Sequence, residues 1–332
     1  MNTFTGASSL LRAAALTAAL AGPGVNAAAQ AITTLDIATA YPDGNFHVVN
    51  LQQFAQDVEA ATRGAVKVKV HPGGSLAKAP EIRKAVTDGR IAAGEVFGPS
   101  LSSLHGVFGL DGIPFFTTNY TAARKLWKAS EAMVMSKLEG EGLTLLMSVP
   151  WPPQGLFAVK PIATPKDLAG LSMRENSPPL KRLAELVDAK PVRVETPELA
   201  AAAKEGKLDL VFTSAAQGLD TKLAQSLKHY YLANAWLPRN VVFMNSKTLA
   251  SLPKDQQQTI LELAKRAESR GWTASEAFAE SSTKALQQAG ALVSPLPPEV
   301  KSRLERMGNQ VASEVLKSGD PELWALAAKA LL

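Results

Sequence analysis

The feature that most constrains the fold of this chain is a proline-rich break near its middle. Residues 150–155 read Pro-Trp-Pro-Pro-Gln-Gly, and three prolines with a glycine suit neither a regular helix nor a central strand. Short apolar runs alternate with helical patterns on both sides of the break. A rigid connection between two similar halves explains this arrangement. The sequence therefore predicts two lobes, with Trp151 held in the crevice between them.

Each half is expected to form an α/β sheet, because strands that alternate with helices favour a sheet with helices on its faces. In the first half the expected strands are 34–40, 66–70, 91–97 and 143–149, and the expected helices are 46–62, 80–88 and 120–138. In the second half the expected strands are 156–159, 171–174, 190–194, 207–212 and 240–245, and the expected helices are 179–187 and 196–204. Ligand sites in such sheets lie beyond the strand ends, where the loops diverge.

A long amphipathic pattern with few breaks runs from about residue 254 to residue 289. At about 1.5 Å per residue, a helix of this length spans on the order of 50 Å, which reaches across both lobes. Prolines near residue 297 open a last pair of helices. We expect lobe I to comprise residues 32–150 with about 240–275, and lobe II to comprise residues 151–239 with about 276–332.

The first 31 residues are typical of a secretory signal peptide. Arg12 supplies a positive charge, residues 13–21 form a short apolar run, and Ala29-Gln30-Ala31 is a cleavage pattern. The apolar run is too short to cross a membrane, and no later segment approaches such a length. The sequence therefore predicts a periplasmic protein that is not embedded in the membrane and that begins near Ile32.

Composition excludes several classes of function. The chain has no cysteine, which rules out disulfides, thiolate metal sites and cysteine nucleophiles. Its four histidines lie far apart without metal-ligand spacing, so we expect neither a metal nor a cofactor. The net charge is +5, but basic residues are mixed with acids and do not cluster among aromatic residues, so no nucleic-acid partner is expected. The P-loop, G-x-S-x-G and H-E-x-x-H motifs of common enzymes are absent as well.

Arg174 is the first candidate for ligand binding. It ends a short apolar run and precedes a turn that contains Pro178 and Pro179, so a permanent positive charge stands at the tip of a predicted strand. The planar guanidinium group matches a carboxylate through two parallel hydrogen bonds. The alternative for Arg174 is a surface ion pair.

Other candidates come from segments that the predicted lobes bring to the same crevice. Trp151 and Trp236 stand next to prolines between the lobes, where pocket walls occur, and the alternative for both is a place in the core. Glu95 would accept a ligand hydroxyl or orient the arginine, unless it pairs with a surface lysine. Thr213 and Ser214 offer hydroxyl groups at a strand end, or cap a helix. The remaining candidates for the ligand site are Phe46, Phe97 and Asn240.

The order of several short segments resembles the periplasmic solute-binding subunits of TRAP (tripartite ATP-independent periplasmic) transporters, the DctP-like family. The most specific segment, residues 165–174, reads Pro-Lys-Asp-Leu-Ala-Gly-Leu-Ser-Met-Arg and carries a DLxGLxxR pattern. The resemblance covers nearly all of the chain after the predicted signal peptide. The other segments that carry it are 40–47, 71–76, 112–116, 235–240 and 270–272.

This resemblance implies a two-lobe periplasmic binding protein fold with a long helix spanning both lobes. It further implies that the lobes close around an organic acid, that Arg174 binds the carboxylate of this acid, and that the acid is delivered to membrane permease subunits. Members of the family often carry an acid–Asn pair after the strand that ends at Phe212, where this chain has Thr213-Ser214. Glu175 also departs from the small or aromatic residue that is expected beside the arginine.

The aromatic candidates suggest the body of the ligand. With Phe97, Trp151 and Trp236 as walls, we expect a small carboxylate with an apolar or aromatic body rather than a dicarboxylate. The rival prediction is an exported enzyme on the same scaffold, a dehydratase or lyase, for which Glu95 is the candidate general acid or base. Because no catalytic motif accompanies it, the sequence favours a binding protein without catalytic residues.

Overall fold

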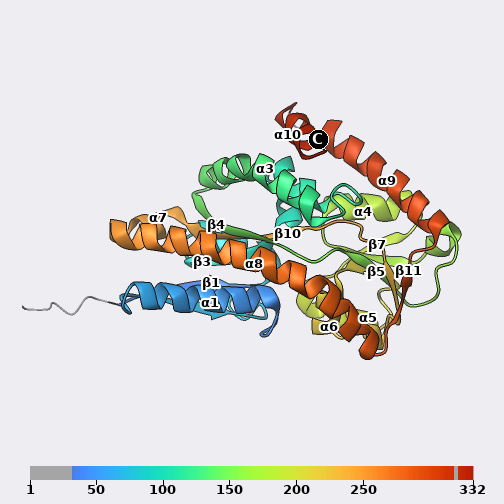
Figure 1. Cartoon of the computed structure of the whole chain (residues 1–332), viewed down its shortest axis with the longest axis horizontal. Helices are drawn as coiled ribbons and strands as arrows, with labels where there is room; N and C mark the ends of the chain where they lie inside the picture. The colour runs from blue at the N-terminus through green and yellow to red at the C-terminus, as the bar shows by residue number, and fades with distance from the viewer. Residues whose placement is uncertain (1–31, 318–320, 332) are drawn as a thin grey trace, which may run out of the picture. The chain divides into compact units, whose positions relative to one another are not determined.

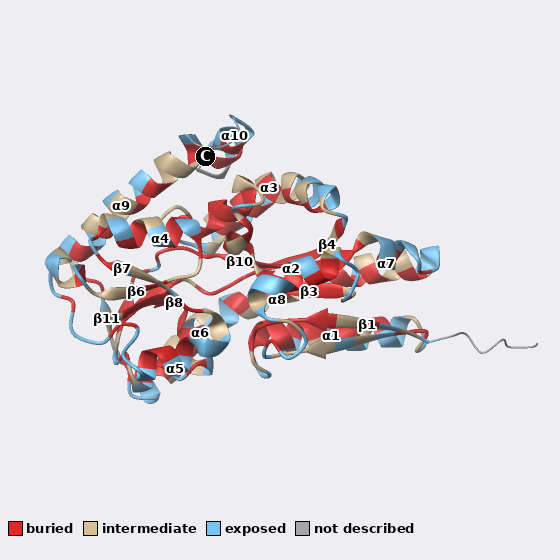
Figure 2. Ribbon diagram, turned by 180° about the vertical axis from the view of Figure 1, so that it is seen from behind, coloured by how far each residue is buried: buried red, intermediate tan, exposed pale blue. Residues whose placement is uncertain are grey.

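A computed structural model of the chain describes residues 32–317 and 321–331, and the predicted signal peptide (residues 1–31) lies outside this part. Two mixed sheets organise the described residues, so the predicted α/β class is confirmed (Figure 1). Buried residues concentrate on the strands and on the helix faces that cover them (Figure 2).

The first sheet combines strands from the first half of the chain with one strand from beyond the proline-rich break. Parallel pairing joins its first three strands, and the late strand inserts antiparallel between the third and the fourth. In spatial order the strands are β2 (Val66–His71), β1 (Thr33–Ala38), β3 (Ala93–Phe97), β10 (Arg239–Asn245) and β4 (Leu143–Pro150).

All residues of β10 are buried, because the strand lies between two neighbours and under helices. The insertion places Asn240 beside Phe97 and Val242 beside Glu95 in the sheet. The helices of this half are α1 (Phe46–Ala61), α2 (Ala79–Thr87), α3 (Tyr120–Gly140) and α7 (Ser246–Ala250).

The second sheet is built from strands that follow the break. Its centre is the antiparallel pair β5–β8, and β6 pairs in parallel with both β8 and β7. In spatial order the strands are β11 (Leu292–Pro295), β9 (His229–Leu232), β5 (Gly155–Ala158), β8 (Leu210–Thr213), β6 (Ser172–Glu175) and β7 (Lys190–Arg193). The helices of this half are α4 (Pro178–Leu186), α5 (Leu199–Lys204) and α6 (Ala215–Asp220).

The predicted long helix is present as α8 (Lys254–Gln288). Its first part packs against α1 and β4 of the first sheet, and its last part packs against α6 and β11 of the second (Figure 1). Gly271 lies where the helix packs tightly against β4, since a Cβ atom there would lie 2.6 Å from a methyl group of Val149. A side chain at this position would push the helix away from the sheet.

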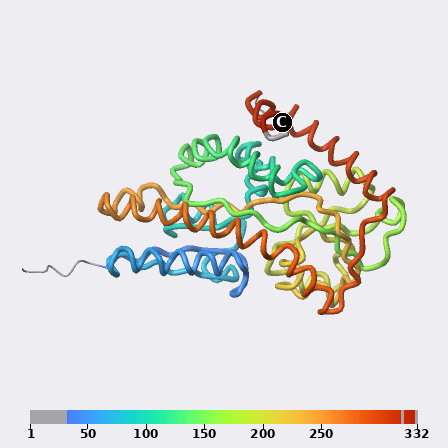
Figure 3. Tube along the Cα trace, viewed as in Figure 1, coloured from blue at the N-terminus to red at the C-terminus, as the bar shows by residue number. Residues whose placement is uncertain are grey.

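Two further helices complete the described chain, as the sequence predicts. Helix α9 (Pro298–Lys317) packs against α4, and α10 (Pro321–Leu331) returns to α3 on the first half of the chain (Figure 3). The sequence assigns residues 276–332 to lobe II, yet α10 lies on α3. Among the described helices, none is both long enough and apolar enough to cross a membrane.

Candidate ligand-binding site

A cavity of about 390 Å³ is lined by elements of both sheets and by the proline-rich connection. The position of this cavity matches the crevice that the sequence predicts. Five of the predicted site residues line it: Glu95, Phe97, Trp151, Arg174 and Thr213.

Arg174 lies within β6 rather than at its tip, and its side chain is buried, with 3% of the residue exposed. Its Nε donates to the carbonyl oxygen of Val194 at 3.0 Å, and its Nη2 donates to Thr196 Oγ1 at 3.3 Å. Both acceptors are neutral, and they use two of the five N–H donors that an arginine carries. Burial lowers the pKa of Arg174 to about 10, so the group is still charged at neutral pH. It is therefore a buried cation facing a cavity, not a surface ion pair.

Glu95 is a buried carboxyl group in the same cavity, contributed by β3 of the other sheet. Thr39 Oγ1 donates to its Oε2 at 2.6 Å, and Asn240 Nδ2 donates to its Oε1 at 2.9 Å. His47 Nδ1 lies 3.3 Å from Oε1, but burial lowers the pKa of this histidine well below its usual value and keeps it neutral. Burial raises the pKa of Glu95 to about 7. Within the part of the chain that the structure describes, no lysine forms the surface pair with Glu95 that the sequence left open.

Asn240 does not line the cavity but holds three residues that do. Its Oδ1 accepts hydrogen bonds from Tyr41 Oη at 3.0 Å and from Trp151 Nε1 at 2.9 Å, while its Nδ2 donates to Glu95. Trp151 also packs against Tyr41 and His47, with ring centroids 5.0 Å and 4.3 Å apart. Asn240 is thus a positioning residue behind the wall rather than the ligand contact that was expected.

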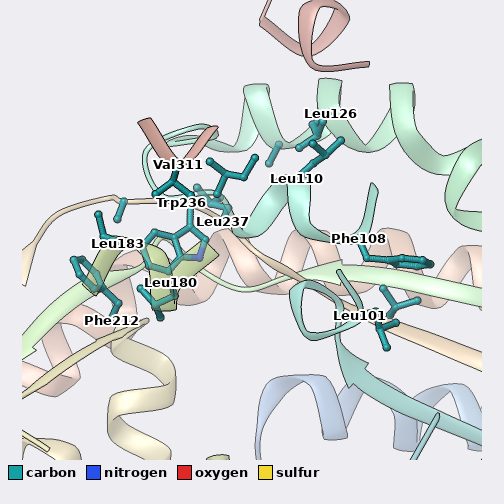
Figure 4. Packing of buried hydrophobic residues seen from close by; sticks show 14 of the residues in the cluster. Leu101, Phe108, Leu110, Leu126, Leu180, Leu183, Phe212, Trp236, Leu237 and Val311 are labelled. Carbon is teal, nitrogen blue, oxygen red and sulfur yellow. The ribbon is translucent and has the colours of Figure 1, made fainter. Parts of the chain in front are cut away.

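Three other predicted residues also lie away from the cavity. Phe46 packs edge-on against Trp151 at 5.3 Å and supports it from behind. Trp236 is buried in the hydrophobic core with Phe212 and leucines of α4, so the core alternative is correct for it (Figure 4). Ser214 caps α6, because its hydroxyl accepts the N–H of Gln217 at 3.2 Å.

The sequence missed several lining residues. Tyr41 and Gln217 are the most informative, since Gln217 Nε2 is buried without a hydrogen-bond partner among the described residues. The sequence placed Tyr41 in a loop at a strand end, where pockets lie, without naming it as a ligand contact, whereas nothing in the sequence marks Gln217. The other polar or charged lining residues that were not predicted include Arg83, Gln154, Asn176, Arg193, Glu195 and Thr196.

The two other arginines of the cavity wall are already neutralised. Arg83 pairs with Glu141 at 2.8 Å. Arg193 pairs with Glu195 at 2.8 Å and with Glu175 at 3.4 Å. Glu175, which departs from the family pattern, therefore balances a neighbouring arginine. Within residues 32–317 and 321–331, no group of three or more His, Asp or Glu side chains is placed to hold a metal ion.

Two α/β sheets joined by a connection that lines a cavity, with a long helix packed on both, define a two-lobe binding protein. The chain belongs to the bacterial extracellular solute-binding protein family 7, the DctP family, which residues 37–318 match. The predicted membership of the DctP-like family is thereby confirmed.

Two solved structures and one further bacterial protein are similar to this chain over most of its length. It is 37% identical to DctP6 of Bordetella pertussis, with 90% of this chain and 99% of the other aligned and a TM-score of 0.87. It is 33% identical to DctP7 of the same organism, with 90% and 100% aligned and a TM-score of 0.88. Both are described as extracytoplasmic solute receptors binding pyroglutamic acid. The C4-dicarboxylate-binding periplasmic protein DctP of Rhodobacter capsulatus is 29% identical over 71% of each chain.

Proposed function

We propose that this protein is the periplasmic receptor of a TRAP transporter and that it binds a compact monocarboxylate, with pyroglutamate as the first candidate. The observation that carries this proposal is the buried guanidinium group of Arg174, which faces the cavity and touches only neutral acceptors. A buried cation without a partner is costly, and a ligand carboxylate supplies the missing charge. Two relatives of 33% and 37% identity that bind pyroglutamic acid support the choice of ligand.

The remaining wall of the cavity suits a compact ring. Phe97 and Trp151 supply the aromatic surface, and Thr213, Gln154 and Gln217 supply hydrogen-bonding groups. A ligand that combines a carboxylate, a few methylene groups and an amide matches such a mixture of apolar and polar surface.

Closure of two lobes around the acid is the proposed mechanism. Lobe I is built on the first sheet (residues 32–150 and about 240–275), and lobe II is built on the second (residues 151–239 and about 276–332). Asn45 Nδ2 at the start of α1 donates to Asp220 Oδ2 at the end of α6, with a distance of 2.5 Å. This hydrogen bond links the two proposed lobes and would stabilise their approach. The closed form is then presented to the membrane permease subunits of the transporter.

Binding without turnover is the proposed outcome, in preference to a dehydratase or lyase. Family members and the solved relatives are solute-binding receptors. The carboxyl oxygens of Glu95 already accept hydrogen bonds from Thr39 and Asn240, which suits a fixed acceptor better than a group that must exchange protons with a substrate. Recovery of the ligand unchanged after long incubation, measured by mass spectrometry, would support this assignment, and a new product would contradict it.

A ligand panel tests the proposed function directly. Thermal unfolding and calorimetry are measured with L-pyroglutamate, with succinate and malate as C4-dicarboxylates, and with a branched 2-oxo acid. We expect pyroglutamate to raise the melting temperature by an amount that grows with the logarithm of its concentration above Kd, because a ligand that binds only the folded state stabilises it by mass action. Stabilisation by the C4-dicarboxylates alone would assign the chain to the substrate class named for the Rhodobacter capsulatus relative.

A further inference from the structure

The charges that face the cavity are unevenly balanced. Of the charged residues that line it, Arg83 and Arg193 are paired with acids, and Glu195 is the partner of Arg193. Among the described residues, no acid lies within 4 Å of Arg174, and no lysine or arginine lies within 4 Å of Glu95 (the nearest basic group is the neutral His47). One cation and one acid therefore remain for the ligand to satisfy, and they come from different sheets.

We propose that Glu95 is the specificity-determining residue of this site and that it accepts a hydrogen bond from an N–H donor of the ligand. The inference rests on the proposed function, since it assumes that a compact acid such as pyroglutamate places its carboxylate on Arg174. It goes further by requiring a second property of the ligand, a donor at a separate point from the carboxylate. Among compact acids, a lactam fulfils this requirement and a lactone or an ether does not.

The physical reason is the asymmetry of buried hydrogen bonds. A buried carboxylate that faces a donor gains a charge-assisted hydrogen bond, whereas one that faces a lone pair loses its solvation without any return. Sites built to bind an N–H group for this reason reject analogues that lack it by large factors. A second ligand carboxylate would be repelled by the same group.

Gln217, on helix α6 next to the second sheet, offers a donor that complements Glu95. Its Nε2 is a buried donor without a partner among the described residues, and its side chain lines the same cavity. A lactam carries an N–H donor and a carbonyl acceptor on one edge. The cavity wall offers an acceptor at Glu95 and an unused donor at Gln217, so both groups of such an edge can be satisfied.

The network behind Glu95 keeps its carboxyl group in place and sets its charge. Thr39 from β1 and Asn240 from β10 each donate to one of its oxygens. The titratable groups nearby are His47 from α1 and Tyr41 from the turn after β1. Burial lowers the pKa of His47 well below its usual value and raises the pKa of Tyr41, so burial favours the neutral form of both groups. Arg174 keeps its charge between pH 5.5 and pH 8, and Glu95 is the group that titrates.

The test compares two ligands that differ at one atom. L-Pyroglutamate and its lactone analogue, 5-oxotetrahydrofuran-2-carboxylate, are titrated into the full-length mature protein by calorimetry at pH 8 and at pH 5.5. We expect the lactam to bind on the order of 100-fold more tightly than the lactone at pH 8. At pH 5.5 the ratio should fall by about tenfold, because protonated Glu95 can donate to the ring oxygen. Both ligand carboxylates stay ionised, since α-carboxyl groups titrate near pH 3.5.

The second part of the test uses the variant Glu95→Gln, because the glutamine amide can donate a hydrogen bond to the lactone ring oxygen. We expect this variant to lower the lactam-to-lactone ratio about tenfold and to remove its pH dependence. The matched control is Glu268→Gln on α8, which neutralises another largely buried carboxyl group that accepts hydrogen bonds from Ser148 and Trp127 but does not line the cavity. The control should keep the wild-type ratio at both pH values.

The outcomes separate this inference from the proposed function. Tight binding of pyroglutamate with equal affinity for the lactone at pH 8 overturns the role of Glu95 and leaves the proposed function intact. A lactam-to-lactone ratio that Glu95→Gln leaves unchanged at pH 8 overturns it as well, and the first of these two measurements needs no variant to fold. If pyroglutamate does not bind at all, the result contradicts both the proposed ligand and the inference about Glu95.

Discussion

Two buried arginines of this molecule have opposite surroundings. Arg239 donates from Nε to Asp111 Oδ2 at 2.7 Å, and the backbone N–H of Arg239 donates to the same oxygen at 3.0 Å. Its guanidinium group also lies 4.4 Å from the ring centroid of Trp127. Arg174 is equally buried, but it touches only a carbonyl and a hydroxyl oxygen.

The difference teaches how to distinguish a structural charge from a binding charge. Arg239 and Asp111 neutralise each other inside the fold, so neither is available to a ligand. Among the described residues, neither Arg174 nor Glu95 forms an ion pair with an oppositely charged group within 4 Å, although Glu195 interacts with Arg174 at longer range, and both face the same cavity. A buried charge that faces a cavity and has only neutral hydrogen-bond partners is a candidate site for a ligand.

Arg239→Ala is expected to produce the largest effect, on stability. It leaves Asp111 buried without a partner, which costs about 3–5 kcal/mol of the free energy of unfolding. Urea denaturation measures this loss. Replacing both partners by apolar residues, Arg239→Met with Asp111→Leu, should recover most of it, because no buried charge then remains unpaired. A double variant as unstable as the single one would show that the pair does more than neutralise itself.

Arg174→Ala is expected to act on binding instead. Loss of the guanidinium group should weaken the affinity for the carboxylate ligand by about 2–5 kcal/mol, or roughly 30-fold to several thousand-fold. The free energy of unfolding of the ligand-free protein should change little or rise, since a buried charge without a charged partner has been removed. Calorimetry and urea denaturation of the same preparation give both values. Retained micromolar affinity would contradict the role of Arg174 as the carboxylate site.

Glu95 is expected to make stability depend on pH. Because burial raises its pKa from 4.5 to about 7, the folded state holds the proton more tightly than the unfolded chain does. Its contribution to the free energy of unfolding is therefore full below about pH 4.5 and is lost as the pH rises through about 7. The loss is at most about 3 kcal/mol.

Burial also raises the pKa values of Asp111 and Glu268, so the wild-type profile alone does not isolate Glu95. The informative quantity is the difference between wild type and Glu95→Gln, measured by urea denaturation at pH 5 and pH 8. We expect the wild type to lose stability relative to the variant between these values. Parallel profiles would mean that Glu95 is already ionised at pH 5 in the folded protein.

Thr213 and Ser214 show the same contrast between a residue for binding and a residue for stability, and the expected effects are the smallest. Ser214→Ala removes the cap of α6 and should cost about 1 kcal/mol of stability without weakening ligand binding. Thr213→Val should leave stability nearly unchanged and reduce affinity by about fivefold, the value of one hydrogen bond of about 1 kcal/mol. The reverse pattern would exchange the roles of the two hydroxyl groups.

Much of the fold could be predicted from local patterns. Strand β2 alternates strictly, and α8 keeps its helical spacing across its whole length, so both were predicted within a residue or two. Strands β5 and β6 have four residues each and were predicted, whereas the equally short strands β9 and β11 were missed. They are strands only because each pairs with the other and β9 also pairs with β5.

The site was predictable to a lesser degree. Trp151 and Trp236 look alike in the sequence, since Trp151 lies between two prolines and Trp236 lies two residues before Pro238. Trp151 is turned to the cavity by its hydrogen bond to Asn240, whereas Trp236 packs against Phe212 in the core. No local pattern separates the two, because the partner of each comes from a distant part of the chain.

The sequence by itself determined the alternation of strands and helices, the break between the two halves, the long helix and the presence of an arginine at the end of a short apolar run. These features depend on backbone chemistry and hydrophobic spacing, which act over a few residues. The tertiary structure decided which buried charges neutralise each other and which remain for a ligand. Arg174 and Arg239 differ in this respect only because β10 inserts next to β3 and brings Arg239 to Asp111, while β6 carries Arg174 to a cavity that it shares with Glu95.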